Sequence, residues 1–165
     1  MPTPEFVLSL REKIGHDQLW LPGVSVVVVD DAGRILLGRR SDTGRWSIID
    51  GIPEPGEQPA AAAARECEEE AGVRPEILAV VAVETEEPTV YPNGDRCVFL
   101  DIGFVARVGA ERAAAAGVGD GELTAVAWFE PDALPAPLTP HASARISAAR
   151  AWLADPTTPA RFRLE

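Results

Sequence analysis

Glutamate residues are concentrated in one short segment of the sequence, residues 51 to 73. At the helical period of about 3.6 residues per turn, Glu66, Glu69 and Glu70 fall on one side of a helix. Like charges this close repel each other, and near the C-terminal end of a helix they also oppose the helix dipole. A divalent cation such as Mg²⁺ would offset both effects, because it takes oxygen ligands and bridges protein carboxylates to phosphates. The segment therefore predicts a metal site, although a solvated acidic helix face would give the same pattern.

The helix that would carry these glutamates is predicted over residues 58–71. Pro59 suits the first helical position, where no N–H is needed, and Gly72 suits the residue that ends a helix. Small residues with helical spacing form a separate stripe: Ala60, Ala64, Cys67 and Ala71. One side of the helix can therefore pack closely on a sheet while another presents carboxylates. Arg65 lies one turn before Glu69 and is placed to pair with it.

The rest of the chain alternates short strands with helices. Helices are predicted over residues 5–14 and 139–153, and strands near 24–29, 34–38, 46–49, 77–85, 97–107 and 123–129. The Ala- and Gly-rich stretch 108–121 fits either a loop or a weak helix, and residues 155–165 are expected to fray. We expect a single α/β domain over residues 1–165, with residues 1–20 as an N-terminal helical extension.

The composition excludes several classes of function. The 165-residue chain has a formal net charge of −11 at pH 7, which disfavours nucleic-acid binding because that activity depends on a basic surface. Its two cysteines are too few for a disulfide scaffold. No apolar run is long enough to span a bilayer, and the first residues lack the pattern of a signal peptide. We expect a cytoplasmic protein with neither nucleic acid nor membrane as a partner.

The glutamate segment resembles the signature of the Nudix hydrolases, position for position. The matching residues are Gly51, Glu57, Arg65, Glu66, Cys67, Glu69, Glu70, Gly72 and Val73. The 24–38 hairpin, Trp46 and the 127–129 run also look like the usual Nudix framework. The resemblance covers residues 20 to 155 and implies an α/β/α sandwich with a mixed β-sheet between helices.

The resemblance implies a hydrolase that cleaves the diphosphate bond of a nucleoside diphosphate linked to another moiety, with Mg²⁺ or Mn²⁺ as cofactor. By position, Glu66, Glu69 and Glu70 would hold the cation, with Glu57, Arg65 and Gly51 supporting them. The signature does not define which residue accepts the proton of the attacking water. Glu66 and Glu69 are candidates within the helix, and Glu122 is the preferred candidate outside it, because flanking glycines would let its loop move. A plain surface turn is the alternative for Glu122.

One position departs from the family pattern. Many members have Pro-Gly-Gly before the matching segment, whereas this chain has Ile49-Asp50-Gly51. In the family the backbone carbonyl before the glycine often binds the metal, and that carbonyl would belong to Asp50. The Asp50 side chain could alter the loop conformation or add a carboxylate near the metal.

The substrate is less clear than the chemistry. Pro88 lies about 15 residues beyond the signature segment, where the ADP-ribose pyrophosphatases resemble one another in having a proline. Tyr91 lies slightly further on, where the diadenosine polyphosphate hydrolases often have a tyrosine. Arg45, Trp46 and Tyr91 are candidate substrate-binding residues, with core packing as the alternative for both aromatic side chains. ADP-ribose or another nucleotide sugar is the favoured substrate. Nucleoside triphosphates, diadenosine polyphosphates and a non-catalytic role as a nucleotide sensor are alternatives, as is an acidic interaction module. A homodimer is also possible.

Overall fold

The computed structural model describes residues 3–91, 93–119 and 121–164. Within these residues, eight strands form one mixed sheet with the order β3-β2-β1-β7-β5, in which β4 pairs with β1, β6 with β7 and β8 with β2. The strands are β1 (Leu19–Asp30), β2 (Ile35–Arg40), β3 (Trp46–Ser47), β4 (Ile49–Gly51), β5 (Glu76–Thr85), β6 (Thr89–Val90), β7 (Arg96–Val108) and β8 (Leu123–Phe129). The helices are α1 (Glu5–Ile14), α2 (Pro59–Ala71), α3 (Ala110–Ala113) and α4 (Pro140–Ala154).

Helices cover both faces of this sheet, which confirms the predicted α/β/α sandwich. Alternation along β1 sends successive valines to opposite faces. On one face, Val26 packs with Cys67 of α2, and on the other, Val27 packs with Ile146 of α4. The two apolar layers therefore place α2 and α4 on opposite faces of the sheet, and any side chain of β1 or β4 can be assigned to one of them.

The helix α2 begins and ends at the predicted residues. Gln58 is its N-cap residue and Pro59 its first residue, as expected where no N–H is needed. Gly72 adopts a left-handed conformation with φ of 69°, and its N–H bonds to carbonyls of the last turn. The two local signals in the sequence are sufficient to define the helix that carries the glutamates.

Strands whose bounds depend on pairing with another strand differ from the predicted ranges. The strand expected over residues 24–29 is β1, which begins five residues earlier at Leu19, because it pairs in parallel with β7 along its whole length. The strand expected over residues 46–49 is split into β3 and β4, which pair with β2 and β1 respectively. For the open choice over residues 108–121, the described residues show the short helix α3 followed by irregular chain as far as residue 119.

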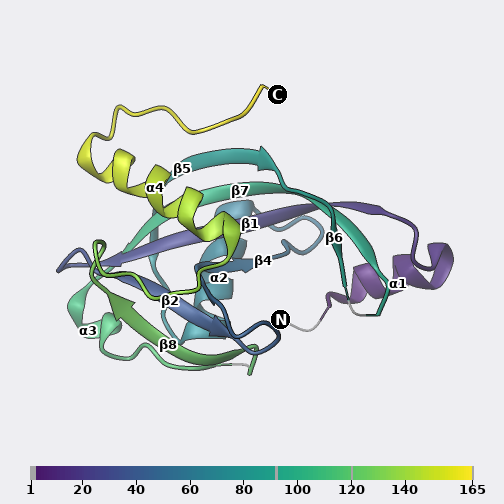
Figure 1. Ribbon diagram of the computed structural model, residues 1–165, viewed down its shortest axis with the longest axis horizontal. Coiled ribbons are helices and arrows are strands. Elements are labelled where there is room, and N and C mark those ends of the chain that lie inside the picture. Colours follow the sequence, from purple (N-terminus) through teal and green to yellow (C-terminus); the bar gives the residue numbers. More distant parts are fainter. Residues whose placement is uncertain (1–2, 92, 120, 165) are drawn as a thin grey trace.

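The N-terminal helix α1 lies at the far end of a long arm made by β1, β7 and β6 (Figure 1). Its Val7 packs with Leu21 and Cys97 of the arm. The Arg11 guanidinium anchors it by donating to the carbonyl oxygen of Arg96 at 2.8 Å. Among the described residues, no helix is long and apolar enough to cross a membrane.

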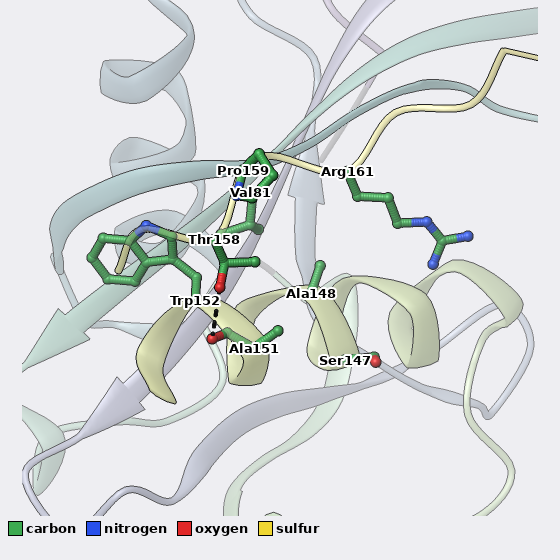
Figure 2. A pocket seen from close by; sticks show the side chains of 8 residues that line it. All are labelled: Val81, Ser147, Ala148, Ala151, Trp152, Thr158, Pro159 and Arg161. Atoms are coloured by element: carbon green, nitrogen blue, oxygen red, sulfur yellow. Dashed lines mark hydrogen bonds between the residues drawn. The ribbon is translucent and has the colours of Figure 1, made fainter. Parts of the chain in front are cut away.

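The segment after α4 runs along the outer edge of β5. Arg161 N–H donates to the Val81 carbonyl at 2.8 Å, and Val83 N–H donates to the Arg161 carbonyl at 2.9 Å. Between this segment and α4 lies a hollow of about 210 Å³ (Figure 2). It is lined by Val81, Ser147, Ala148, Ala151, Trp152, Thr158, Pro159 and Arg161. Its lining contains no carboxylate, thiol or imidazole, so it is not a candidate for the chemistry predicted from the sequence.

Candidate functional site

Glu66 is buried at the contact between α2 and β4. Its side chain is 1% exposed, and Gly51 is the residue against which it packs. A Cβ atom at residue 51 would lie 2.3 Å from Glu66 Cδ, so no larger residue fits there without moving the carboxylate. Burial raises the pKa of Glu66 to about 7, against the opposing effect of the Arg65 guanidinium. A fully solvated acidic face is therefore excluded for this glutamate.

Arg65 connects three of the predicted glutamates. Its Nε and Nη2 donate to the two oxygens of Glu57 at 3.0 and 2.9 Å. Its Nη1 donates to Glu69 Oε2 at 3.0 Å and lies 2.9 Å from Glu66 Oε1. The hydrogen bond from Arg65 lowers the pKa of Glu57. The pairing of Arg65 with Glu69, inferred from helical spacing, is present, and Glu57 joins it from the preceding loop.

The three glutamates of α2 differ in their surroundings. Glu70 is buried, whereas the Glu69 side chain is 44% exposed. Among residues 3–91, 93–119 and 121–164, no three His, Cys, Asp or Glu side chains converge in a geometry that would hold a metal ion. Nevertheless, neither carboxylate oxygen of Glu66 accepts a hydrogen bond in this part of the chain. A buried carboxylate of this kind suits a divalent cation, which binds oxygen ligands and offsets the cost of burying the charge.

The loop that carries Glu122 is attached to the end of α2. Gly119 N–H donates to the Glu70 carbonyl at 2.9 Å, and Gly117 N–H donates to the Ala71 carbonyl at 3.0 Å. These bonds satisfy carbonyl groups that a helix terminus leaves unpaired. Past the loop, the Glu122 carbonyl accepts a bond from Ser41 N–H at 2.8 Å. Backbone contacts therefore hold residues 117–119, which precede Glu122 in the sequence, against the end of α2 that carries Glu70.

The Asp50 side chain lies on the other face of the sheet from α2. Gly51 faces Glu66, and because neighbouring strand residues alternate, Asp50 points toward α4. Its Oδ2 is 3.3 Å from His141 Nε2, and its Oδ1 is 3.5 Å from Arg40 Nη1. Burial would raise the pKa of Asp50, but His141 and Arg40 lower it below its usual value. The carboxylate holds the start of α4 and the end of β2 together, while only the backbone of residue 50 adjoins the α2 side.

The three candidate substrate-binding residues are not grouped with the glutamates. Trp46 packs edge-on against Phe129, with ring centroids 5.0 Å apart, within the apolar layer beneath α4. Arg45 donates from Nη1 to the Leu138 carbonyl at 3.2 Å. Tyr91 follows β6 and is 40% exposed, and burial of its hydroxyl raises its pKa. Trp46 thus has the core packing that was the alternative for it, whereas Tyr91 remains accessible.

A second group of charges was not predicted from the sequence. Arg145 of α4 is buried, and it donates to Asp101 Oδ2 at 2.8 Å and to Glu84 Oε2 at 2.6 Å. The small residue Gly103 makes room for it, since a Cβ atom there would lie 2.8 Å from Arg145 Cδ. The sequence offered one signal, a cluster of glutamates at the end of a strand, but the partner on α4 is 61 residues away. This network orients α4 on the sheet.

The arrangement as a whole favours metal-assisted chemistry on an anionic substrate. One buried and one exposed carboxylate flank a fixed guanidinium, and a third carboxylate lies on the same helical turn. Divalent cations held by such groups neutralise phosphate charge and activate water. Of the described residues, the serines are not placed in the site by any contact above, and Cys67 is buried with its pKa raised by burial.

Comparison with known proteins agrees with this class. The family model described as the NUDIX domain matches residues 19–150. Over 117 residues the chain is 38% identical to a MutT-like protein of Streptomyces ambofaciens, covering 66% of this chain and 63% of that protein. Over 87 residues it is 44% identical to an RNA pyrophosphohydrolase of Roseobacter denitrificans, covering 52% of this chain and 49% of that protein. The match therefore spans less than two thirds of either relative.

Solved structures give the same fold. An ADP-ribose pyrophosphatase from Streptococcus suis aligns with a TM-score of 0.65 and 20% identity, covering 86% of this chain and 97% of that one. The NUDIX domain of NrtR from Shewanella oneidensis, complexed with ADP ribose, aligns with a TM-score of 0.64 and 20% identity, covering 93% and 99%. The fold and the site define a Nudix α/β/α sandwich, and the chain belongs to the NUDIX family.

Proposed function

We propose that the protein is a metal-dependent pyrophosphohydrolase that cleaves the diphosphate bond of a nucleoside diphosphate linked to another moiety. The observation that carries the proposal is the buried Glu66 carboxylate, whose Oε1 lies 2.9 Å from Arg65 Nη1 without an aligned hydrogen bond among the described residues, and which adjoins a complete set of signature residues. A divalent cation would stabilise the charged form of a carboxylate kept out of water in this way more strongly than the Arg65 contact alone.

Glu66, Glu69 and Glu70 are the residues that would hold Mg²⁺ or Mn²⁺, together with the backbone carbonyl of Asp50. When bound, the cation supplies charge neutralisation at the diphosphate and lowers the pKa of a water molecule. Arg65 fixes the Glu66 and Glu69 carboxylates while anchored on Glu57. Glu122 is our candidate for the residue that accepts the proton of the attacking water. Its attached loop supports this role, because the loop lies against the same helical turn.

ADP-ribose or another nucleotide sugar is the substrate class we favour. One solved structure of the same fold is that of an ADP-ribose pyrophosphatase, and another holds ADP ribose. At 20% identity these likenesses concern the fold, so the substrate has to be found by assay. Other pyrophosphate substrates should be assayed as well, because one relative is named an RNA pyrophosphohydrolase and Tyr91 is exposed.

The test is phosphate release from a panel of nucleotides with Mg²⁺ or Mn²⁺, detected after treatment with a coupled phosphatase. The panel holds ADP-ribose, other nucleotide sugars, diadenosine polyphosphates, NADH and nucleoside triphosphates. We expect metal-dependent turnover of a nucleotide sugar that falls by at least roughly a hundredfold in Glu69→Gln. A Glu68→Gln variant is the matched control, because Glu68 lies on the same helix and pairs with Arg74 outside the site.

A nucleotide sensor without activity is the second candidate, favoured by the NrtR domain that holds ADP ribose. The same panel separates the two functions. Binding of a nucleotide without turnover, with Mn²⁺ affinity intact, would contradict the enzyme and support the sensor. Absence of both binding and turnover for the whole panel would contradict both.

A further inference from the structure

The guanidinium of Arg65 divides its nitrogens between two tasks. Nε and Nη2 form a forked pair with the two oxygens of Glu57, which fixes the position and plane of the group. Nη1 lies 2.9 Å from Glu66 Oε1 and 3.0 Å from Glu69 Oε2. A single nitrogen of Arg65, the Nη1 NH₂ group, therefore contacts both carboxylates to which the proposed function assigns a cation.

The Glu66 carboxylate is poorly satisfied by this contact. Its side chain is 1% exposed, and among the described residues Oε2 has no donor while Oε1 has only the Arg65 contact, which is not an aligned hydrogen bond. The ion pair with Nη1 involves Oε1 alone within the described part of the chain. A divalent cation satisfies a buried carboxylate better than one corner of a guanidinium does, because it carries twice the charge and binds oxygen directly.

We propose that Nη1 of Arg65 is an internal counter-ion that a divalent cation displaces from Glu66 and Glu69. The inference rests on the proposed function, since it takes these glutamates as ligands. The forked pair with Glu57 keeps the guanidinium in place while Nη1 gives up its contacts, so Arg65 is a positioning residue. Competition for the same oxygens, together with repulsion between two cations, makes Arg65 limit the affinity of the site. Arg65 therefore sets the cation concentration at which the site fills.

The test is calorimetric titration of the full chain with Mn²⁺ in the absence of nucleotide. Arg65→Gln removes the competing charge, and Arg74→Gln is the matched control with the same change in net charge. Arg74 pairs with Glu68 at 2.7 Å, and both of these side chains are about half exposed. At about 0.15 M salt, where exposed charges are largely screened, we expect Mn²⁺ to bind Arg65→Gln at least roughly fivefold more tightly than the parent chain. The control should change by less than about twofold.

Unchanged or weaker binding by Arg65→Gln, with binding by the parent chain intact, would overturn the inference and leave the proposed function standing. An equal gain in Arg74→Gln would also overturn it, because the effect would then be one of overall charge. Mn²⁺ binding by Arg65→Gln but not by the parent chain would support the competition. No Mn²⁺ binding by either the parent chain or Arg65→Gln would overturn the inference and the proposed function together.

If circular dichroism shows that Arg65→Gln is unfolded, Arg65→Lys is the variant that decides. Lysine keeps the positive charge, but its single nitrogen cannot pair with both Glu57 oxygens and also contact Glu66 and Glu69. We therefore expect Arg65→Lys to bind Mn²⁺ at least roughly twofold more tightly than the parent chain, and weaker binding would overturn the inference.

Discussion

Gly51 determines where the Glu66 carboxylate lies. In Gly51→Ala the added Cβ atom would overlap the carboxyl group, so the glutamate must leave its buried position. We expect Mn²⁺ affinity to fall at least roughly tenfold, as for other residues that orient metal ligands, and stability to fall by about 1–3 kcal/mol. Gly109→Ala is the control, since a Cβ there meets no atom closer than 3.8 Å. Calorimetry and urea unfolding measure both effects, and equal affinities for the two variants would refute the role of Gly51.

At the same scale, the sequence predicted contacts within one helix better than contacts with other elements. Spacing was enough to pair Arg65 with Glu69, because both belong to one helix. Burial of Glu66 could not be predicted, because it depends on a strand 15 residues earlier that packs onto α2. The direction of the Asp50 side chain likewise depends on the pairing of β4 with β1, which defines the two faces of that strand.

The loop between α3 and β8 depends on close approach to the end of α2. A Cβ atom at residue 119 would lie 1.8 Å from the Glu69 carbonyl oxygen, so Gly119→Ala must detach the loop from the helix. We expect a loss of about 1–3 kcal/mol in the free energy of unfolding and a lower kcat if Glu122 accepts the proton. In Gly117→Ala the nearest atom to the Cβ is 4.0 Å away, and this variant should retain both properties. Thermal unfolding and initial rates provide the comparison; a fully active Gly119→Ala would rule out the role of Glu122.

The contact of α4 with the sheet should depend on pH through Glu84. Burial would raise the pKa of Glu84, but Arg145, Arg161 and Arg163 lower it below the ordinary value of 4.5. A lowered pKa in the folded state contributes stability at pH values above 4.5, and this stability is lost as the pH falls through the folded pKa. Glu84→Gln should therefore be less stable by about 3 kcal/mol at pH 7 and lose less on acidification.

Urea unfolding at pH 7 and at successively lower pH values measures this dependence. Glu76→Gln is the control, because Glu76 is exposed on the same strand. If the parent chain and Glu84→Gln lose stability in parallel between pH 7 and acid, the ion network does not stabilise the fold through Glu84.

Elements with local signals were predicted accurately, and elements defined by a partner were not. The bounds of α1 and α2 follow from amphipathic spacing, a proline and a glycine in the chain itself. The two-residue strand β6 has no such signal, and it exists because it pairs with β7. The same holds for the first five residues of β1, whose strand character comes from their parallel pairs with β7.

For the molecule as a whole, the segment after α4 closes the exposed edge of the sheet. Truncation after Asp155 removes two backbone hydrogen bonds to β5 and the ion pairs of Arg161 and Arg163 with Glu84. We expect stability to fall by about 2–3 kcal/mol and the open strand edge to promote self-association. Urea unfolding and size-exclusion chromatography at increasing concentration measure these outcomes. A truncated chain as stable and as monodisperse as the parent would show that the edge needs no cover.

The parallel pairing of β1 with β7 also has a consequence for the order in which the chain acquires its structure. Leu19 pairs with Cys97 and Asp30 with Val108, so the central strand has no partner on that side until more than half of the chain has been made. Parallel pairs so distant in sequence are slow to form, because a long loop must close before any contact is gained. On the ribosome, the valine-rich β1 can pair early with β2 and β4, but its other edge stays unpaired during this interval and exposes apolar surface that favours aggregation.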